Sequence, residues 1–410
     1  MPSSATTAGQ RRRTDARAVV SHGFSPVLAV WGAWLVLMCG ANLATPLYAV
    51  YRERFGFSNL VLTTVFAAYA IVLIPSLLVF GQLSDRFGRR RVMAGGLGIS
   101  TAGLALFAFA GSAAWLYGAR ALQGVSVGMI SGAATAALVE LDPDGDSRRA
   151  AFLAALAQAG GSGLGPIVGG VLAEWAPAPR QLCYLALLAV TLVAIAIVLR
   201  VPEPATDEGG RWRITRPSVP REIRSQFARV GVTAGLLWAS AALYLSVVPS
   251  YAGKLLDTEN LALLGAIAAL VLLVSCLAQV VARRGALTGR GQPIGLAFLG
   301  ASVVALVLAA PTASLALLLT GAALAGIGHG LGFVDAQDEL NRIAPDERRG
   351  EVTAAFITCI YTAVASSTIA VGLLDQVVSL SVAVAIVAIA LGAAGLAAAV
   401  WHLRSRAGRS

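Results

Sequence analysis

Residues 81–91 read GQLSDRFGRRR, and this short basic stretch lies between two long apolar blocks. The blocks predict helices over 59–82 and 92–111. Each is about twenty residues long, which is what a helix needs to cross a hydrocarbon core about 30 Å thick. The stretch is therefore predicted to be a charged loop between two membrane-spanning helices.

The same alternation of apolar block and polar loop continues along the whole chain. Apolar residues make up 57% of it and charged residues 13%, whereas a soluble domain carries about 25% charged residues. We therefore predict an all-α membrane protein with twelve transmembrane helices. The other ten predicted helices are 26–50, 114–139, 149–174, 181–200, 228–250, 260–282, 292–310, 313–335, 351–374 and 378–402.

The basic residues are divided unequally between the two sides of this topology. Of 31 Lys and Arg residues, 26 fall on the side that holds both chain ends, four fall on the other side, and Arg120 lies within a predicted helix. Cytoplasmic loops are enriched in Lys and Arg, so both ends are predicted to be cytoplasmic. The net charge of +10 follows from this topology, and we expect no nucleic acid partner.

The longest polar stretch between predicted helices divides the chain into two bundles of six helices. Two six-helix halves joined by a cytoplasmic linker form the layout expected of a transporter built from repeats. The predicted segments are a cytoplasmic tail at 1–25, a first bundle at 26–200, a linker at 201–227, a second bundle at 228–402 and a tail at 403–410.

The loop at 81–91 resembles the loop 2–3 motif of the major facilitator superfamily, Gly-x-Leu-x-Asp-Arg-x-Gly-Arg-Arg. Its glycines permit a tight turn, and Asp85 can meet a helix N-terminus or an arginine and so hold the two halves closed. Two plainer interpretations stay open: the loop as a positive anchor, and Glu140 as a solvated carboxylate. The resemblance implies a gating role for Gly81, Asp85, Arg86, Gly88, Arg89, Arg90 and Glu140.

The predicted fourth helix contains Arg120, Gln123 and Gly124 in an order that resembles the helix 4 motif of the same superfamily. A buried arginine in a membrane helix costs at least about 2.5–3.5 kcal/mol. Arg120 should therefore face a polar cavity and have a partner there. The alternative is that its long side chain extends to the outer membrane surface.

The predicted fifth helix reads GSGLGPIVGG over 161–170, which resembles the helix 5 pattern of the antiporter branch. Glycines four residues apart let helix backbones approach closely, and a proline bends the helix. Generic small-residue packing is the alternative interpretation. The residues of this motif are Gly161, Gly165, Pro166, Gly169 and Gly170.

Polar side chains at membrane depth are candidates for a substrate or proton pathway. His329 lies well within a predicted span, where it could couple protons or serve only as a packing residue; both interpretations stay open. The pathway candidates are Asn42, Tyr48, Tyr69, Arg120, Gln123, Gln158, Trp238, Tyr244, His329, Asp335 and Tyr361.

The sequence contains no constellation typical of an enzyme. Its four cysteines and three histidines are scattered and show no metal-ligand spacing. It also lacks a phosphate-binding loop of the kind that an ATP-driven pump requires. We expect no cofactor and no metal.

By resemblance, the function is proton-coupled efflux of a small organic molecule, a drug or a metabolite, through alternating access. An importer or facilitator on the same fold, a membrane enzyme and a non-transporting sensor are the alternatives. The expected partners are the substrate, protons and the lipid bilayer. We expect a monomer in a bacterial cytoplasmic membrane.

Overall fold

A computed structural model of the chain describes residues 25–80, 83–203, 216–283 and 289–407. Every regular element in these ranges is a helix. The first half contains α2 (Pro26–Asn42), η1 (Thr45–Leu47), α3 (Tyr48–Phe55), α4 (Asn59–Phe80), α5 (Leu83–Phe87), α6 (Arg89–Ala108), α7 (Ala113–Glu140), α8 (Ser147–Trp175) and α9 (Leu182–Val198). The second contains η2 (Arg221–Ile223), α10 (Arg224–Ser246), α11 (Val248–Leu256), α12 (Leu261–Ala282), α13 (Gly291–Thr312), α14 (Leu315–Ile343), η3 (Asp346–Arg348), α15 (Arg349–Leu374) and α16 (Leu380–Ala407).

The predicted all-helical membrane fold is confirmed. Among the described residues, eleven helical segments are long and apolar enough to cross a membrane, and α9 is a shorter apolar helix of 17 residues. Large apolar side chains such as Leu192, Val193 and Leu396 are more than half exposed on the surface. Such a surface suits contact with lipid rather than with water.

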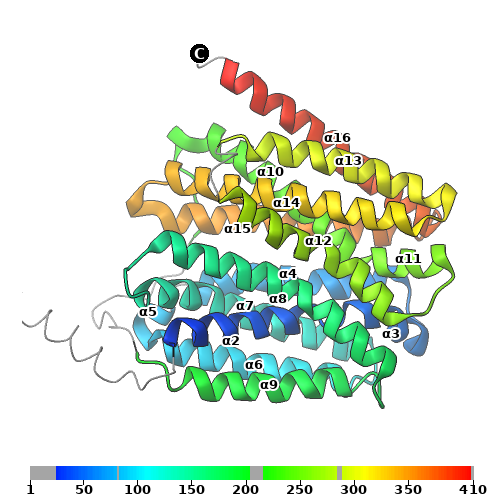
Figure 1. The fold of residues 1–410 in the computed structure, drawn as a ribbon, viewed down its shortest axis with the longest axis horizontal. Coiled ribbons are helices and arrows are strands. Elements are labelled where there is room, and N and C mark those ends of the chain that lie inside the picture. The colour runs from blue at the N-terminus through cyan, green and yellow to red at the C-terminus, as the bar shows by residue number, and fades with distance from the viewer. Residues whose placement is uncertain (1–24, 81–82, 204–215, 284–288, 408–410) are drawn as a thin grey trace, which may run out of the picture.

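The helices pack as two groups, one from each half of the sequence. Helices α2 to α9 pack mainly with one another, as do α10 to α16. In Figure 1 the first group lies below the second, with the helix axes roughly horizontal. Two helix pairs join the groups closely: α8 packs against α12, and α4 packs against α15.

The first span is broken, although the sequence predicts one helix over 26–50. The α-helix α2 ends at Asn42, and a turn of 3-10 helix precedes α3. The cause is Pro46, which has no backbone N–H to donate to the carbonyl group of Asn42.

Two helices of the second half are longer than the sequence predicts. Helix α14 continues to Ile343, beyond its predicted end at 335, and α10 begins at Arg224 rather than at 228.

Candidate functional site

A cavity of about 1630 Å³ lies between the two halves. Helices α2, α4, α7 and α8 of the first half and α10, α12, α14 and α15 of the second contribute side chains to its wall. The cavity is larger than the roughly 300–1,000 Å³ of a typical small-molecule pocket. The sequence candidates that line it are Gln158, Trp238, His329, Asp335 and Tyr361.

Charged side chains surround the mouth of the cavity, where α8 and α15 begin and α14 ends. Arg229 of α10 forms an ion pair with Glu339 of α14, with 2.8 Å between Nη2 and Oε1. Gln292 of α13 donates a hydrogen bond from Nε2 to the other oxygen of Glu339 at 2.6 Å. Three helices of the second half therefore meet at one cavity-lining carboxylate.

Asp335 also lines the cavity, but its carboxylate serves the start of α13. The backbone N–H of Gly289 donates to Oδ1 at 2.9 Å, and the backbone N–H of Gln292 donates to Oδ2 at 3.1 Å. Those N–H groups lie at a helix N-terminus, where they lack partners within the helix. Asp335 therefore fixes α13 against α14.

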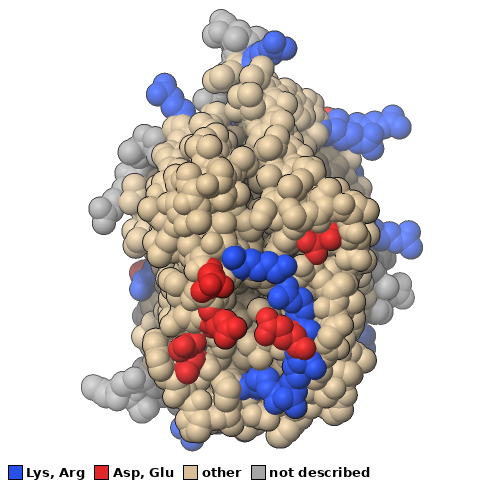
Figure 2. Space-filling model, turned by 90° about the vertical axis from the view of Figure 1, so that its right-hand side faces the viewer, with Lys and Arg blue, Asp and Glu red and all other residues tan. Residues whose placement is uncertain are grey.

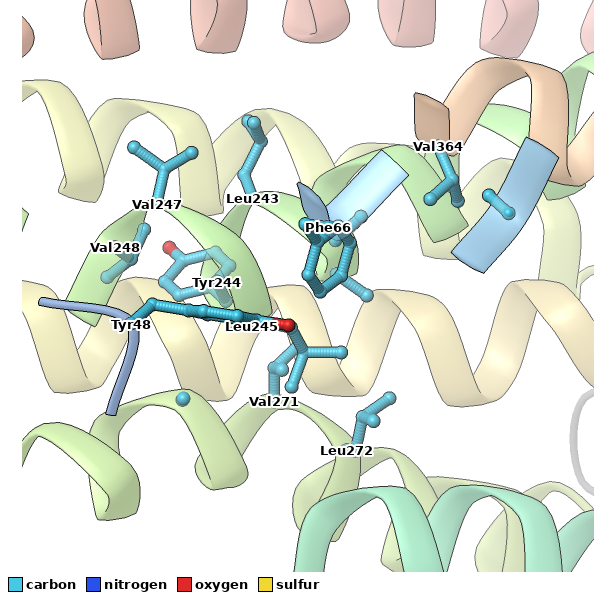
Figure 3. Close-up of a cluster of buried hydrophobic side chains, with 14 of the residues drawn as sticks. Tyr48, Phe66, Leu243, Tyr244, Leu245, Val247, Val248, Val271, Leu272 and Val364 are labelled. Carbon is cyan, nitrogen blue, oxygen red and sulfur yellow. The ribbon is translucent and has the colours of Figure 1, made fainter. Parts of the chain in front are cut away.

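The opposite end of the cavity is closed by apolar side chains of both halves. Tyr48 and Phe66 of the first half lie in one cluster with Leu245, Val271 and Val364 of the second (Figure 3). Tyr48 was a pathway candidate, but here it is buried in this plug and does not line the cavity.

Polar contacts between the halves lie beyond the plug. Asn59 of α4 accepts a hydrogen bond from Arg52 at 2.8 Å and donates one to Asp375, which follows α15, at 2.7 Å. Glu174 of α8 accepts a hydrogen bond from the backbone N–H of Leu261 at 2.8 Å, at the start of α12. Figure 2 looks on the end of the molecule where α3 and α11 lie, and it shows acidic and basic side chains gathered near the centre. The cavity is thus open at one end and sealed at the other.

Arg120 lies wholly inside the first half. Its Nη1 donates to the carbonyl oxygen of Ala41 at 2.6 Å and to Oε1 of Gln123 at 2.9 Å, and its Nη2 donates to the carbonyl oxygen of Phe66 at 3.3 Å. The guanidinium carbon lies 4.6 Å from the ring centroid of Tyr69. Arg120 is 1% exposed, so the interpretation that it extends to the outer membrane surface is wrong.

One partner of Arg120, the carbonyl group of Ala41, belongs to the broken end of α2. Gln123 adds a hydrogen bond from its Nε2 to the carbonyl oxygen of Gly40 at 2.8 Å. The last carbonyl groups of a helix lack partners within it and carry its partial negative charge. Arg120 and Gln123 therefore hold the break in the first span to α7, and neither lines the cavity.

Four other pathway candidates, Asn42, Tyr69, Tyr244 and Tyr361, have contacts within the protein. The rings of Tyr69 on α4 and Tyr361 on α15 meet edge to face, with centroids 6.1 Å apart, so this pair joins the two halves. Tyr244 is hydrogen-bonded to Ser302, with 3.2 Å between their oxygens, and Asn42 donates to the carbonyl oxygen of Met38. Of these, only Tyr361 lines the cavity.

The gating candidates converge on Arg89, which begins α6. Its guanidinium forms ion pairs with Asp85 on α5 and, at 3.0 Å, with Glu140 at the end of α7. All three belong to the first half, so this link does not itself join the halves. Arg86 lies over the ring of Phe87 at 5.5 Å. Gly81 lies outside the described residues.

The turn between α5 and α6 packs against the end of the first half. Gly88 has φ of +92°, a conformation that side chains other than glycine rarely adopt. The carboxylate of Glu203 lies against Gly88 and accepts a hydrogen bond from the backbone N–H of Arg90 at 3.1 Å. The sequence did not identify Glu203, which lies in the predicted linker.

The loop between α7 and α8 is fixed by the buried side chain of Asp142. Burial acts to raise the pKa of this carboxyl, but hydrogen bonds from the backbone N–H groups of Asp144 at 3.0 Å and Asp146 at 3.2 Å outweigh it. With Arg149 nearby, they hold the pKa below its usual range. The ionised carboxylate thereby fixes the start of α8 at the cavity mouth.

The glycines of α8 let it pack closely on both halves. A Cβ atom at Gly165 would overlap the carbonyl oxygen of Cys39 in α2, and one at Gly170 would overlap the carbonyl oxygen of Leu261 in α12. Gly161 and Gly169 likewise face the backbone of the first span, and the carbonyl group of Pro166 faces Gly265 of α12. The motif therefore lies where the two halves meet.

We expect Gly165→Ala to destabilise the protein by about 1–3 kcal/mol, the usual cost of overpacking, and to lower transport. The added methyl group must push α8 away from the backbone of α2. Gly160→Ala is the matched control on the same helix, because its Cβ would meet only the sulfur of Cys276, at 3.8 Å. Thermal unfolding in detergent would measure both variants, and equal stability of the two would show that this close approach is unimportant.

Several site residues were missed by the sequence reasoning. Glu339, Arg229 and Gln279 all line the cavity, yet the first two lie near predicted helix ends and resemble ordinary loop charges. Asn59 and Asp375 meet across 316 positions of sequence. One signal was available in the sequence. Asp338 and Glu339 follow Asp335 by three and four residues, which places the three acids on one face of a helix and indicates an acidic face on α14.

The sequence profile of the Major Facilitator Superfamily matches residues 30–336. The chain therefore belongs to this superfamily, and it is a transporter rather than an enzyme. The solved structure of a D-xylose-proton symporter superposes with a TM-score of 0.73 at 20% identity, covering 93% of this chain and 97% of that one. This likeness shows that the two share a fold.

Two relatives match over shorter segments. The multidrug efflux pump LfrA of Mycolicibacterium smegmatis is 44% identical over 108 residues, which cover 26% of this chain and 21% of that protein. The puromycin resistance protein pur8 of Streptomyces alboniger is 34% identical over 146 residues, which cover 34% of this chain and 28% of that protein. The chain thus matches less than a third of the length of either relative.

Proposed function

We propose that this protein exports a small organic molecule, a drug or a metabolite, by alternating access in exchange for protons. One observation carries the proposal: the cavity between the halves is open at one end and sealed at the other. Export is favoured by the name of LfrA, a multidrug efflux pump, and pur8 is named for resistance to puromycin. The moving units in this proposal are the predicted bundles at 26–200 and 228–402.

The basic residues support an orientation for this cycle. The helix ends at the cavity mouth carry Arg148, Arg342 and Arg349, and excess arginine favours the cytoplasmic side. We therefore place the mouth and both chain ends in the cytoplasm of a bacterial cell, so that the substrate enters from inside. We expect a monomer, because the cavity is formed by one chain.

The residues around Arg89 are proposed as the inner gate. The loop that contains Asp85, Arg86, Gly88 and Arg90 would approach the second half when the mouth closes, and Gly81 belongs to the same sequence motif. Glu140 and Arg89 would then hold this loop in position. The ion pairs within the first half support this arrangement.

Proton coupling is proposed to use Glu339. Protonation would neutralise its carboxylate and break its ion pair with Arg229, which changes how α10 meets α14. Because Glu339 lines the cavity, substrate and proton can influence each other there. The carboxylate among the sequence candidates for a substrate or proton pathway was Asp335, not Glu339.

We expect Glu339→Gln to abolish the response of transport to a pH gradient while leaving downhill substrate exchange. The amide keeps the shape of the side chain and one of its two acceptor oxygens but cannot bind or release the proton. Proteoliposomes with an imposed pH gradient would measure both activities. Glu347→Gln, at an exposed acid outside the cavity, is the control, and gradient-driven export by Glu339→Gln would exclude Glu339 as the coupling group.

The proposed function is tested by efflux from bacteria that lack their main drug exporters. Cells that produce the protein should expel ethidium or puromycin faster than cells with the empty vector. An uncoupler should abolish the difference, because it collapses the proton gradient. Export that continues unchanged in the presence of the uncoupler would contradict proton exchange. Uptake of the compound driven by the proton gradient would contradict export.

A further inference from the structure

An aromatic cluster of the second half lines the cavity. The ring centroid of Trp238 on α10 lies 4.6 Å from that of His329 and 5.6 Å from that of Phe333, both on α14, with the rings nearly perpendicular. Phe333 stacks on His329 at 5.4 Å and on Phe356 of α15 at 6.4 Å. All four residues contribute to the cavity wall. This cluster, which we call the aromatic box, provides flat apolar surface for a flat ring.

Polar atoms in and beside the box have no hydrogen-bond partner within the described part of the chain. They are Nε2 of His329, Nε1 of Trp238 and Oε1 of Gln279, all buried and all on cavity-lining residues. His329 and Gln279 are each 1% exposed. Buried polar atoms are nearly always paired in native proteins, so three unpaired ones gathered at this cluster indicate a partner that arrives through the cavity.

The hydrogen bonds around these atoms show which of them can donate and which can accept. Gln279 donates from Nε2 to Oγ of Ser275 at 3.1 Å, which leaves its Oε1 as a free acceptor. The Ser275 hydroxyl group then has one hydrogen to donate, and Nδ1 of His329 lies 2.8 Å away. If Nδ1 accepts this hydrogen, the neutral imidazole carries its proton on Nε2. His329 and Trp238 thus offer two donors, and Gln279 offers one acceptor.

We propose that the aromatic box binds flat aromatic substrates that carry a carbonyl oxygen beside an N–H, as an aromatic lactam does. The carbonyl oxygen would accept from His329 Nε2 and Trp238 Nε1, and the N–H would donate to Gln279. The rings of Phe333 and Phe356 would hold the aromatic body. This inference rests on the proposed function and names the substrate class of that cavity.

The test is a series of three ligands bound to the purified full-length protein in detergent. Isocarbostyril, a bicyclic aromatic lactam, has the carbonyl oxygen and the N–H; its N-methyl form lacks the N–H; naphthalene lacks both groups. Calorimetric titration should find that loss of the N–H weakens binding about three- to tenfold, as expected for one neutral hydrogen bond. Loss of the carbonyl oxygen, which accepts two hydrogen bonds, should weaken binding further. Equal binding of the three ligands to the unchanged protein would overturn the proposal.

Two variants test which side chain recognises each polar group of the ligand. Gln279→Met should remove the preference for isocarbostyril over its N-methyl form, and Trp238→Phe should reduce the preference of the N-methyl form over naphthalene. Trp175→Phe, on a side chain that is 69% exposed, should leave both ratios unchanged. Because ratios are compared, a variant that folds poorly lowers all three affinities alike. Wild-type ratios in both Gln279→Met and Trp238→Phe would reject the aromatic box.

The two proposals can fail separately. Efflux of ethidium or puromycin by a protein with no preference among the three ligands would leave the proposed function standing and overturn the aromatic box. A clear preference in binding without any efflux would support the box and count against export.

Discussion

Arg120→Ala is expected to destabilise the protein by several kcal/mol and to abolish transport. The substitution leaves the buried carbonyl groups of Ala41 and Phe66 and the amide oxygen of Gln123 without their donor. An unsatisfied buried acceptor costs about 1–3 kcal/mol, and the emptied volume adds to this cost. The broken end of α2 would then keep only the hydrogen bond from Gln123 to Gly40 as its side-chain attachment to α7.

Arg120→Lys should lie between wild type and alanine in both stability and transport. Lysine keeps the charge but lacks the planar group whose two terminal nitrogens reach separate carbonyl groups. Thermal unfolding and efflux at matched expression would give the order, with Arg54→Ala, at an exposed arginine of α3, as the control. Unchanged unfolding of Arg120→Ala would show that these hydrogen bonds do not hold the break.

Asp85→Asn is expected to reduce transport at least tenfold while leaving folding nearly normal. Loss of the carboxylate charge removes one of the two ion pairs of Arg89 and weakens the hold on the loop at 83–91. A difference of about 1.4 kcal/mol between two access states already changes their ratio tenfold.

Efflux and thermal unfolding should both be measured for Asp85→Asn. Asp144→Asn, at an exposed acid between α7 and α8, is the matched control, because Asp144 offers only its backbone N–H to Asp142. A variant with wild-type flux would remove Asp85 from the gate. A variant that unfolds early would show a structural role instead.

The open and closed ends of the cavity differ in how they are held. The closed end combines an apolar plug with hydrogen bonds between the halves, through Asn59 and Asp375 and through Glu174 and Leu261. The ion pair of Arg229 with Glu339 at the cavity mouth stays within the second half, and that of Arg89 with Glu140 stays within the first. This difference is what leaves one end open.

The sequence by itself determined the number of spans, their order and the superfamily. These properties depend on local patterns: the length of each apolar block and the spacing of glycines and charges in the loop at 81–91 and in 161–170. The sequence did not determine the helix ends, because the break before Pro46 and the extension of α14 to Ile343 occur within apolar or mixed stretches.

The tertiary structure alone decided which polar residues face the cavity. Arg120 and His329 are both polar residues inside apolar helices, yet Arg120 binds the backbone of a neighbouring helix and His329 lines the cavity. Hydropathy reports the depth of a residue in the membrane but not its direction around the bundle. That direction is set by packing, where the glycines of α8 bring α2 and α12 close and leave the space between the halves open at one end.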